Sequence, residues 1–350
     1  MRQGVLLLVS LVLWSGDRLT GQNLILRDLT LVSGAAIDRM DIQGVQLADG
    51  RRIAWDAVLR GDAGDRQPDF DRWLAEVGEP LFRIGRRLKS GDHGSLQPWA
   101  DQLAARAARE SAPSPALYLA RSAQVQDRLH FGQRAAAVIP LLELLALRES
   151  APELKRLDRL TGLRFADQGI CENLIPVWFD PESAGRVVAM LESTGEPVSP
   201  AATVYRQSLK TAAGGQTRPT AGDAVASEIA WWPVIHRAQV ALAEGDAATV
   251  LADLDPDRLT ETPVAHAVAL YYSGLAARNG RSPNQAQPVQ WALVLLSVPA
   301  LYEDRFPELS AAAMDAVVDH PQFRDNRQFD GLRDELKNRY RNTVFGRKYQ

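Results

Sequence analysis

The 350-residue chain contains a single cysteine, Cys171, and five histidines. One cysteine excludes an intramolecular disulfide, so a hydrophobic core must stabilise the fold. We expect Cys171 to be buried, because free cysteine is among the most buried residue types. No two histidines stand four residues apart, as paired metal ligands on one helix face would. The sequence therefore predicts neither a metal site nor a cofactor.

Motifs of catalysis are also missing. The chain has no G-x-S-x-G, H-E-x-x-H, C-x-x-C, G-x-x-x-x-G-K-[ST] or G-x-G-x-x-G sequence. The formal net charge is -3, which gives no electrostatic reason to expect nucleic acid as a partner. These absences favour a non-catalytic protein, although a site assembled from distant residues would leave no such signature.

The chain has no apolar run of the length that a membrane-spanning helix needs, and its longest apolar run lies near the N-terminus. VLLLVSLVLW (5–14) follows a basic start and precedes small residues. Because a membrane-spanning helix needs about 20 apolar residues, this run is too short to span a bilayer. The pattern is typical of a secretory signal peptide over 1–21, cleaved near Gly21. We expect a periplasmic or secreted protein whose mature chain has no transmembrane span. The alternative is the first core element of a cytosolic protein.

Residues 22–62 have the pattern of a small β element. LILRDLTLV (24–32) is rich in strand-forming residues, and GVQLADGRRIAW (44–55) alternates between apolar and polar residues. Asp49-Gly50 interrupts the alternation, and this dipeptide is a strong signal for a tight β-hairpin. A hairpin alone is marginal in water, so the 24–32 segment or a helix must cover it.

The rest of the chain has helical periodicity. The framework Leu-x-x-Gly-Asp occurs in LKSGDHGSL (88–96) and again in LAEGDAATV (242–250). Glycine commonly follows the end of a helix, and an aspartate can cap the next one. Related glycines and following prolines predict helix ends and helix starts: Gly91, Gly132, Gly245 and Gly280, with Pro98, Pro140 and Pro288. We expect antiparallel helical hairpins in a first region, 63–213, and a second region, 223–350, joined by a linker over 214–222.

Two segments resemble the tetratricopeptide-repeat family: AHAVALYYSGLAARNG (265–280) and HRAQVALAEGDAATVL (236–251). The resemblance implies an α-solenoid whose concave surface holds a protein or peptide segment. A DG hairpin followed by helical repeats is also similar to a family of secreted bacterial proteins, which implies no activity. A non-repeating all-α domain is the alternative.

The segment 161–185 lacks a helical period and carries a candidate site. In IPVWFDPES (175–183), Trp178 and Phe179 are candidate anchors for a partner, and Asp180 supplies charge. Long irregular loops are often functional. Asp180 is equally suited to cap a helix that starts at Pro181.

Further aromatic residues are candidates for partner binding. In AWWPVIHR (230–237), Trp231 and Trp232 are adjacent and cannot share one helix face, so we expect one of them to be partly exposed. Helix packing with a kink at Pro233 is the alternative. Tyr271 and Tyr272 are the last two candidates of this kind.

The segment KNRYRNTVFGRKYQ (337–350) is basic. Its cations alternate with aromatic residues, a composition that suits an anionic polymer of the cell envelope: Lys337, Arg339, Arg341, Arg347 and Lys348, with Tyr340, Phe345 and Tyr349. A solvated helix near 329–341 with a frayed tail is the alternative.

The sequence thus favours an exported, non-catalytic binding or scaffolding protein of the cell envelope. The first alternative is a hydrolase of envelope polymers with a site around 161–185. The second is strand addition to an edge formed by LILRDLTLV.

Overall fold

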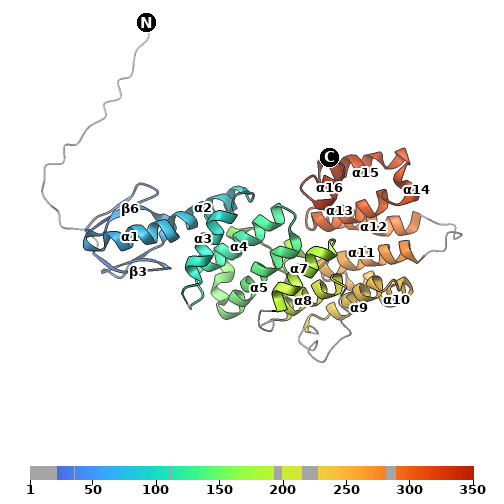
Figure 1. The fold of residues 1–350 in the computed structure, drawn as a ribbon, viewed down its shortest axis with the longest axis horizontal. Helices are drawn as coiled ribbons and strands as arrows, with labels where there is room; N and C mark the ends of the chain where they lie inside the picture. Colours follow the sequence, from blue (N-terminus) through green and yellow to red (C-terminus); the bar gives the residue numbers. More distant parts are fainter. Residues whose placement is uncertain (1–21, 35, 111, 193–198, 215–227, 281–288) are drawn as a thin grey trace, which may run out of the picture. The chain divides into compact units, whose positions relative to one another are not determined.

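The computed structural model describes residues 22–34, 36–110, 112–192, 199–214, 228–280 and 289–350 (Figure 1). The predicted signal peptide, most of the predicted linker and Pro288 lie outside these ranges. The chain divides into two compact units, Met1–Gly78 and Glu79–Gln350. Helices dominate, and the sheets lie in the first unit, which confirms a mainly α protein with a small N-terminal β element.

The first unit contains two antiparallel sheets of three strands each. One has the order β2-β1-β6 and the other β3-β4-β5. The strands are β1 (Asn23–Leu26), β2 (Leu31–Val32), β3 (Ile37–Asp41), β4 (Gly44–Leu47), β5 (Arg52–Ile53) and β6 (Val58–Asp62). The helical elements of this unit are η1 (Trp55–Ala57), η2 (Gly64–Arg66), α1 (Gln67–Trp73) and η3 (Leu74–Gly78).

The predicted hairpin at Asp49-Gly50 is confirmed. It joins β4 to β5, and Gly50 has a φ of 86°. The strand-forming segment 24–32 contains two strands, because a turn with Leu29 at a φ of 70° folds β2 back onto β1. β1 is paired with β2 on one side and β6 on the other. Strand addition at β1 is therefore blocked, and the edge strand that this segment contributes is the two-residue β2.

Trp55 organises the core of this unit. Its ring stacks on that of Trp73 at 6.2 Å and lies 5.6 Å from that of Phe70. The indole nitrogen donates to the carbonyl of Asp41 at 2.6 Å, so the one polar atom of the ring is satisfied. The helical turns after β6 thus supply the cover that the predicted hairpin needs.

The second unit is built from helices and short helical turns. In chain order they are α2 (Glu79–Ser90), α3 (Gln97–Ala107), α4 (Pro115–His130), α5 (Arg134–Ser150), η4 (Pro152–Leu157), α6 (Asp158–Thr161), η5 (Glu172–Leu174), α7 (Pro181–Glu192), α8 (Pro200–Ala212), α9 (Trp232–Ala243), α10 (Ala247–Asp253), η8 (Pro256–Leu259), α11 (Pro263–Asn279), α12 (Val289–Tyr302), α13 (Pro307–Val318), α14 (Pro321–Arg324), η9 (Arg327–Phe329), α15 (Asp330–Asn338) and α16 (Val344–Arg347). None of the described helices combines the length and the apolar character that crossing a membrane requires.

All four glycines that were predicted to follow helix ends do so, and three of them adopt the left-handed conformation. Gly91, Gly132 and Gly245 have φ values of 71°, 70° and 78°, the left-handed conformation that glycine adopts without steric cost. After each of these glycines, the amide of the next residue donates a hydrogen bond to a carbonyl in the last turn of the helix. For example, the Gln133 amide donates to the Arg128 carbonyl at 2.8 Å. Gly280 also follows a helix but has a φ of -79°.

Of the prolines expected to start helices, Pro98 lies in the first turn of α3. Pro140 does not start a helix, because α5 already begins at Arg134. Proline inside a helix leaves the carbonyl four residues earlier without its donor. Here that carbonyl, on Ala136, accepts from Arg128 Nη1 at 2.6 Å, which explains why the helix continues through Pro140.

Helices that are neighbours in the chain pack on one another. Contacts join α3 to α4, α4 to α5, α7 to α8, α8 to α9, and each helix from α9 to α13 to the next. Small residues allow close approach: a Cβ on Gly274 of α11 would lie 2.6 Å from the Leu295 side chain of α12. From α4 onward, buried side chains of successive elements form one cluster, which extends to Phe345 in α16.

The basic C-terminal segment is folded. A helix near 329–341 is confirmed as α15, but the frayed, solvated tail expected after it is wrong. Tyr340 and Phe345 are buried. Lys348 Nζ lies 2.6 Å from Asp315 Oδ2, and Tyr349 donates to Asp315 Oδ1 at 3.0 Å. These aromatic side chains are therefore committed to packing rather than free to stack on a polymer.

Candidate functional site

The irregular segment between α6 and α7 is held in place by hydrogen bonds from surrounding helices. The hydroxyl of Tyr205, on α8, accepts from the Cys171 amide at 3.0 Å and donates to the Leu174 carbonyl at 2.7 Å. The Tyr205 side chain is 0% exposed. Buried backbone groups need partners. The segment supplies some of them itself, as where the Glu172 amide donates to the Arg164 carbonyl at 2.8 Å. Tyr205 supplies the partner for the Cys171 amide and the Leu174 carbonyl.

Other elements contact the same segment. Trp231 Nε1 donates to Gln168 at 2.7 Å, and Gln239 Nε2 donates to the Pro176 carbonyl at 2.8 Å. Glu172 receives two hydrogen bonds from the guanidinium of Arg305. These contacts fix the path of the segment.

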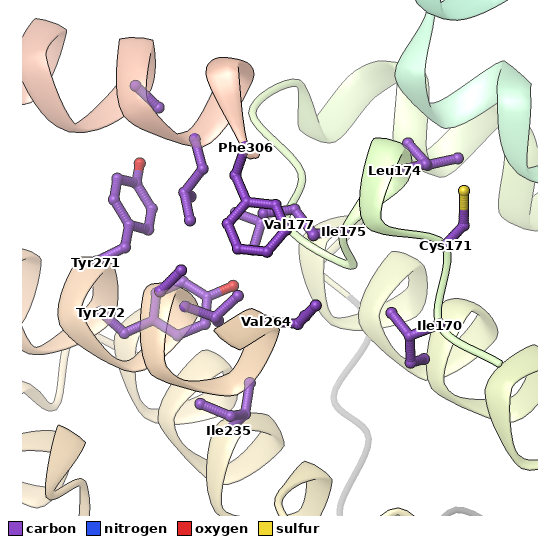
Figure 2. Packing of buried hydrophobic residues seen from close by; sticks show 14 of the residues in the cluster. Ile170, Cys171, Leu174, Ile175, Val177, Ile235, Val264, Tyr271, Tyr272 and Phe306 are labelled. Carbon is purple, nitrogen blue, oxygen red and sulfur yellow. The ribbon is translucent and has the colours of Figure 1, made fainter. Parts of the chain in front are cut away.

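Apolar side chains of this segment enter the common core. Ile170, Leu174, Ile175 and Val177 are buried in one cluster with residues of α11 (Figure 2). Cys171 is buried as expected, and burial raises the pKa of its thiol to about 12. A thiol in this state is structural rather than nucleophilic.

The end of the segment forms one wall of a cavity of about 440 Å³, which we call the apolar cavity. Ligand pockets are commonly about 300–1,000 Å³, so its size suits a side chain or small group. Its walls come from the first turn of α5, residues 178–180, α7 and α16. The lining residues are Gly132, Gln133, Arg134, Ala135, Ala136, Trp178, Phe179, Asp180, Ser183, Arg186, Val187, Met190 and Val344.

Trp178 and Phe179 are fixed by their neighbours. Trp178 Nε1 donates to Ser208 Oγ at 2.9 Å, and its ring lies edge-on to Tyr205. The Phe179 ring contacts those of Tyr271 and Phe345, edge-on, at centroid distances of 6.2 and 4.8 Å. Both aromatic walls are therefore rigid before any ligand binds.

Arg134 is the charged group of this site. It is 8% exposed, and its Nη2 donates to the Ile175 carbonyl at 3.1 Å. Its guanidinium carbon lies 5.6 Å from the centre of the Phe179 ring. Within the described residues its Nε has no hydrogen-bond partner and no carboxylate is close enough to form an ion pair with it. Burial lowers the pKa of Arg134, and Glu308 is the largest charge acting in the other direction.

Asp180 has a structural role at the rim. Its Oδ1 accepts from the amides of Glu182 and Ser183 at 3.1 Å, and its Oδ2 accepts from the Ser183 hydroxyl at 2.5 Å. These hydrogen bonds, the Ser183 hydroxyl first, lower the pKa of Asp180. The carboxylate is thus the cap of α7, as one of the two predictions for it states.

The structure brings three of the seven predicted binding residues to one cavity: Trp178, Phe179 and Asp180. The other four lie in the buried core. They are Trp231, Trp232, Tyr271 and Tyr272, each at most 8% exposed.

The expectation that one of the adjacent tryptophans is exposed is wrong. Trp231 donates to Gln168, while Trp232 donates to Gln207 at 2.7 Å and stacks on His236. The two rings also lie edge-on to each other at 6.0 Å, so both are buried in one packed group. Pro233 lies in the first turn of α9 and produces no kink.

The sequence did not indicate three residues of the cavity. Two of them, Met190 and Val344, are large apolar side chains that are 58% and 41% exposed to solvent. The third, Arg134, lies two residues after Gly132, within a segment that the sequence predicts as a turn. The only sequence feature that could have indicated a site there is a lone cation just before the mostly apolar segment AAAVIPLLELLAL.

Comparison of the chain with protein-family models, curated proteins and solved structures finds no match. In the described ranges, no three His, Cys, Asp or Glu side chains are grouped so as to hold a metal ion. The apolar cavity is therefore the feature of this unit from which a function can be inferred.

Proposed function

We propose that this protein is a non-catalytic binding protein of the cell envelope that holds a peptide segment of a partner protein in the apolar cavity. The observation that carries the proposal is a preformed cavity in which two rigid aromatic rings, exposed aliphatic groups and one buried arginine converge. Large apolar anchors in such pockets supply most of the affinity of peptide recognition.

The chemistry of the walls suits a peptide better than a flat hydrophobic surface would. Trp178, Phe179, Val187 and Met190 offer apolar area for one large side chain. Ala135 and Ala136 belong to the first turn of α5, where backbone amides have no intrahelical acceptor, and Gln133 provides no side-chain cap. A peptide carbonyl or carboxylate beside the anchor would find donors there.

The helical framework supports the same proposal. Successive helices pack on one another, as they also do in tetratricopeptide-like solenoids, and such solenoids present extended surfaces to peptides. Export to the periplasm or the medium is part of the proposal and depends on the sequence of residues 1–21. A cleaved N-terminus near Gln22, read from protein recovered outside the cytoplasm, would support it; an uncleaved cytoplasmic product would contradict it.

The hydrolase alternative has less support. It needs acidic groups free to exchange protons, yet Asp180 is occupied by hydrogen bonds from Ser183 and the α7 amides. Glu182 is 84% exposed at its side chain and pairs with Arg186 across one helical turn. Neither carboxyl group has the environment of a general acid or base.

The test uses a charge at the mouth of the cavity. In Met190→Glu, a 58% exposed side chain that lines the cavity becomes anionic, whereas the matched control Leu251→Glu makes the same change at a 49% exposed leucine of α10. Peptides selected from a random library on the wild-type protein should share a large apolar residue. Their affinity should fall at least tenfold in Met190→Glu and stay unchanged in Leu251→Glu.

Two outcomes would overturn the proposal. One is failure to select any peptide on folded wild-type protein in repeated experiments. The other is equal loss of affinity in both variants, which would place binding elsewhere.

A further inference from the structure

A second cavity, of about 450 Å³, lies on the other side of Arg134. We call it the arginine-lined cavity. It is formed by the turn before α3, the end of α4, the irregular segment, the α12–α13 connection and residues 339–343. Its basic side chains are Arg134, Arg164, Arg305, Arg339, His93 and His130. Three carboxylates share the lining, so the four arginines leave a positive formal charge.

Carboxylates form ion pairs with some of these arginines but not with all of them. Glu172 is 7% exposed and receives the bidentate hydrogen bonds of Arg305, and it also lies 3.6 Å from Arg164. Asp304 lies at the edge, 93% exposed at its side chain, 3.4 Å from Arg339. Arg134 is thus the lining arginine that has no ion pair in the described structure, and it is also the most buried.

Arg134 therefore indicates a ligand. A buried cation without an ion-pair partner is unfavourable, and an anionic ligand in the cavity would supply that partner. Within the described residues its one hydrogen bond, to the Ile175 carbonyl, orients the guanidinium but supplies no negative charge. Four of the five N–H donors of an arginine remain after one such bond.

The other arginines are already oriented. Arg305 lies with its guanidinium carbon 5.6 Å from the centre of the Phe306 ring, and Arg164 Nη2 donates to the Arg305 carbonyl at 2.9 Å. Arg339 is held by Glu303 at 2.8 Å. Their remaining donors need little further ordering to bind an anion, which reduces the entropic cost of binding.

Two histidines add further N–H donors to the lining. His93 follows α2, and His130 is the last residue of α4. The His130 ring lies close to the backbone of Gly94, because a Cβ at that position would be only 2.8 Å from His130 Nε2. Each imidazole has one N–H in its neutral form and two when protonated. An anion bound beside them would meet donors in either state.

We propose that the arginine-lined cavity binds a phosphate group, either as the free ion or as a phosphomonoester on a small molecule. A carboxylate presents one edge to a single guanidinium, whereas the tetrahedral phosphate accepts from several directions at once. Arginines reach this cavity from four separate segments of the chain, and that arrangement fits a tetrahedral dianion.

The experiment is titration calorimetry of the full-length protein at low salt, with inorganic phosphate in one arm and glycerol 3-phosphate in the other. Each is compared with equal ionic strength of chloride. Arg164→Gln and His130→Gln remove donors on this side alone, and Arg186→Gln is the matched control, since Arg186 lines only the apolar cavity. Thermal unfolding verifies that each variant is folded.

We expect saturable binding of at least one probe, weakened tenfold or more in Arg164→Gln and His130→Gln and unchanged in Arg186→Gln. Binding of phosphate alone assigns a free ion, and tighter binding of the ester assigns a phosphorylated metabolite. No binding of either probe overturns the proposal, as does binding that the two cavity variants leave intact. Peptide selection on the apolar cavity does not depend on this result.

Discussion

Tyr205→Phe should destabilise the second unit by about 2 kcal/mol. The hydroxyl that it removes is fully buried and bonds the Cys171 amide at 3.0 Å and the Leu174 carbonyl at 2.7 Å. A buried hydrogen bond contributes about 0.5–1.5 kcal/mol net, and here two backbone groups lose their partner together. Phenylalanine keeps the ring, so no cavity term is added.

Circular dichroism and thermal unfolding measure the effect. For a unit of this size, about 2 kcal/mol corresponds to a fall in melting temperature of roughly 4 °C. Hydrogen exchange of the Cys171 amide should accelerate more than exchange in α12, because the lost bond is local. Trp178, whose ring lies 6.5 Å from that of Tyr205, gives a fluorescence signal close to the change.

Tyr271→Phe is the matched control. Tyr271 is as deeply packed, at 8% exposed, but its hydroxyl makes no hydrogen bond to any described residue. Its removal should shift the melting temperature by less than about 1 °C. Equal shifts in the two variants would refute the claim that the Tyr205 hydroxyl holds the irregular segment.

Three further predictions concern other positions. The Cys171 thiol, whose pKa burial raises to about 12, should react with thiol reagents at pH 8 only as fast as the protein unfolds; rapid labelling of native protein would contradict its burial. Gly346→Ala places a Cβ against backbone carbonyl oxygens of the preceding turn and should cost about 1–3 kcal/mol in urea unfolding, whereas Gly331→Ala, with open space around it, should not. Burial, first, and the interaction with His130, second, lower the pKa of His93. The unfolded state therefore binds this proton more readily, so the protein loses stability as the pH falls below about 6.5. His93→Gln should reduce that loss in urea titrations at pH 5 and 7, and an unchanged pH profile would refute this prediction.

The features that the sequence predicted well are those that depend on a few adjacent residues. The Asp49-Gly50 hairpin and the glycine turns at 91, 132 and 245 need only a positive φ at one position, and glycine reveals it. The cap at Asp180 is equally local, because its acceptors and donors lie within three residues.

The features that it predicted wrongly or missed depend on distant contacts. Pro140 suggested a helix start, but Arg128 satisfies the carbonyl that proline leaves free, so the helix runs on. The turn in 24–32 places a leucine at a positive φ, which residue preferences argue against. Arg134 became a candidate only when Ile175 and Phe179 were seen beside it, 41 and 45 residues further along the chain.

The position of residues 339–349 has a consequence for biosynthesis. Tyr340 and Thr343 line the arginine-lined cavity, and Val344 lines the apolar one. Arg347 donates to the carbonyl of Phe131, 216 positions earlier in the chain. While a ribosome is still making this segment, the preceding helices are present but part of the lining of each cavity is missing. A chain that terminates before residue 339 would therefore have neither cavity in its complete form.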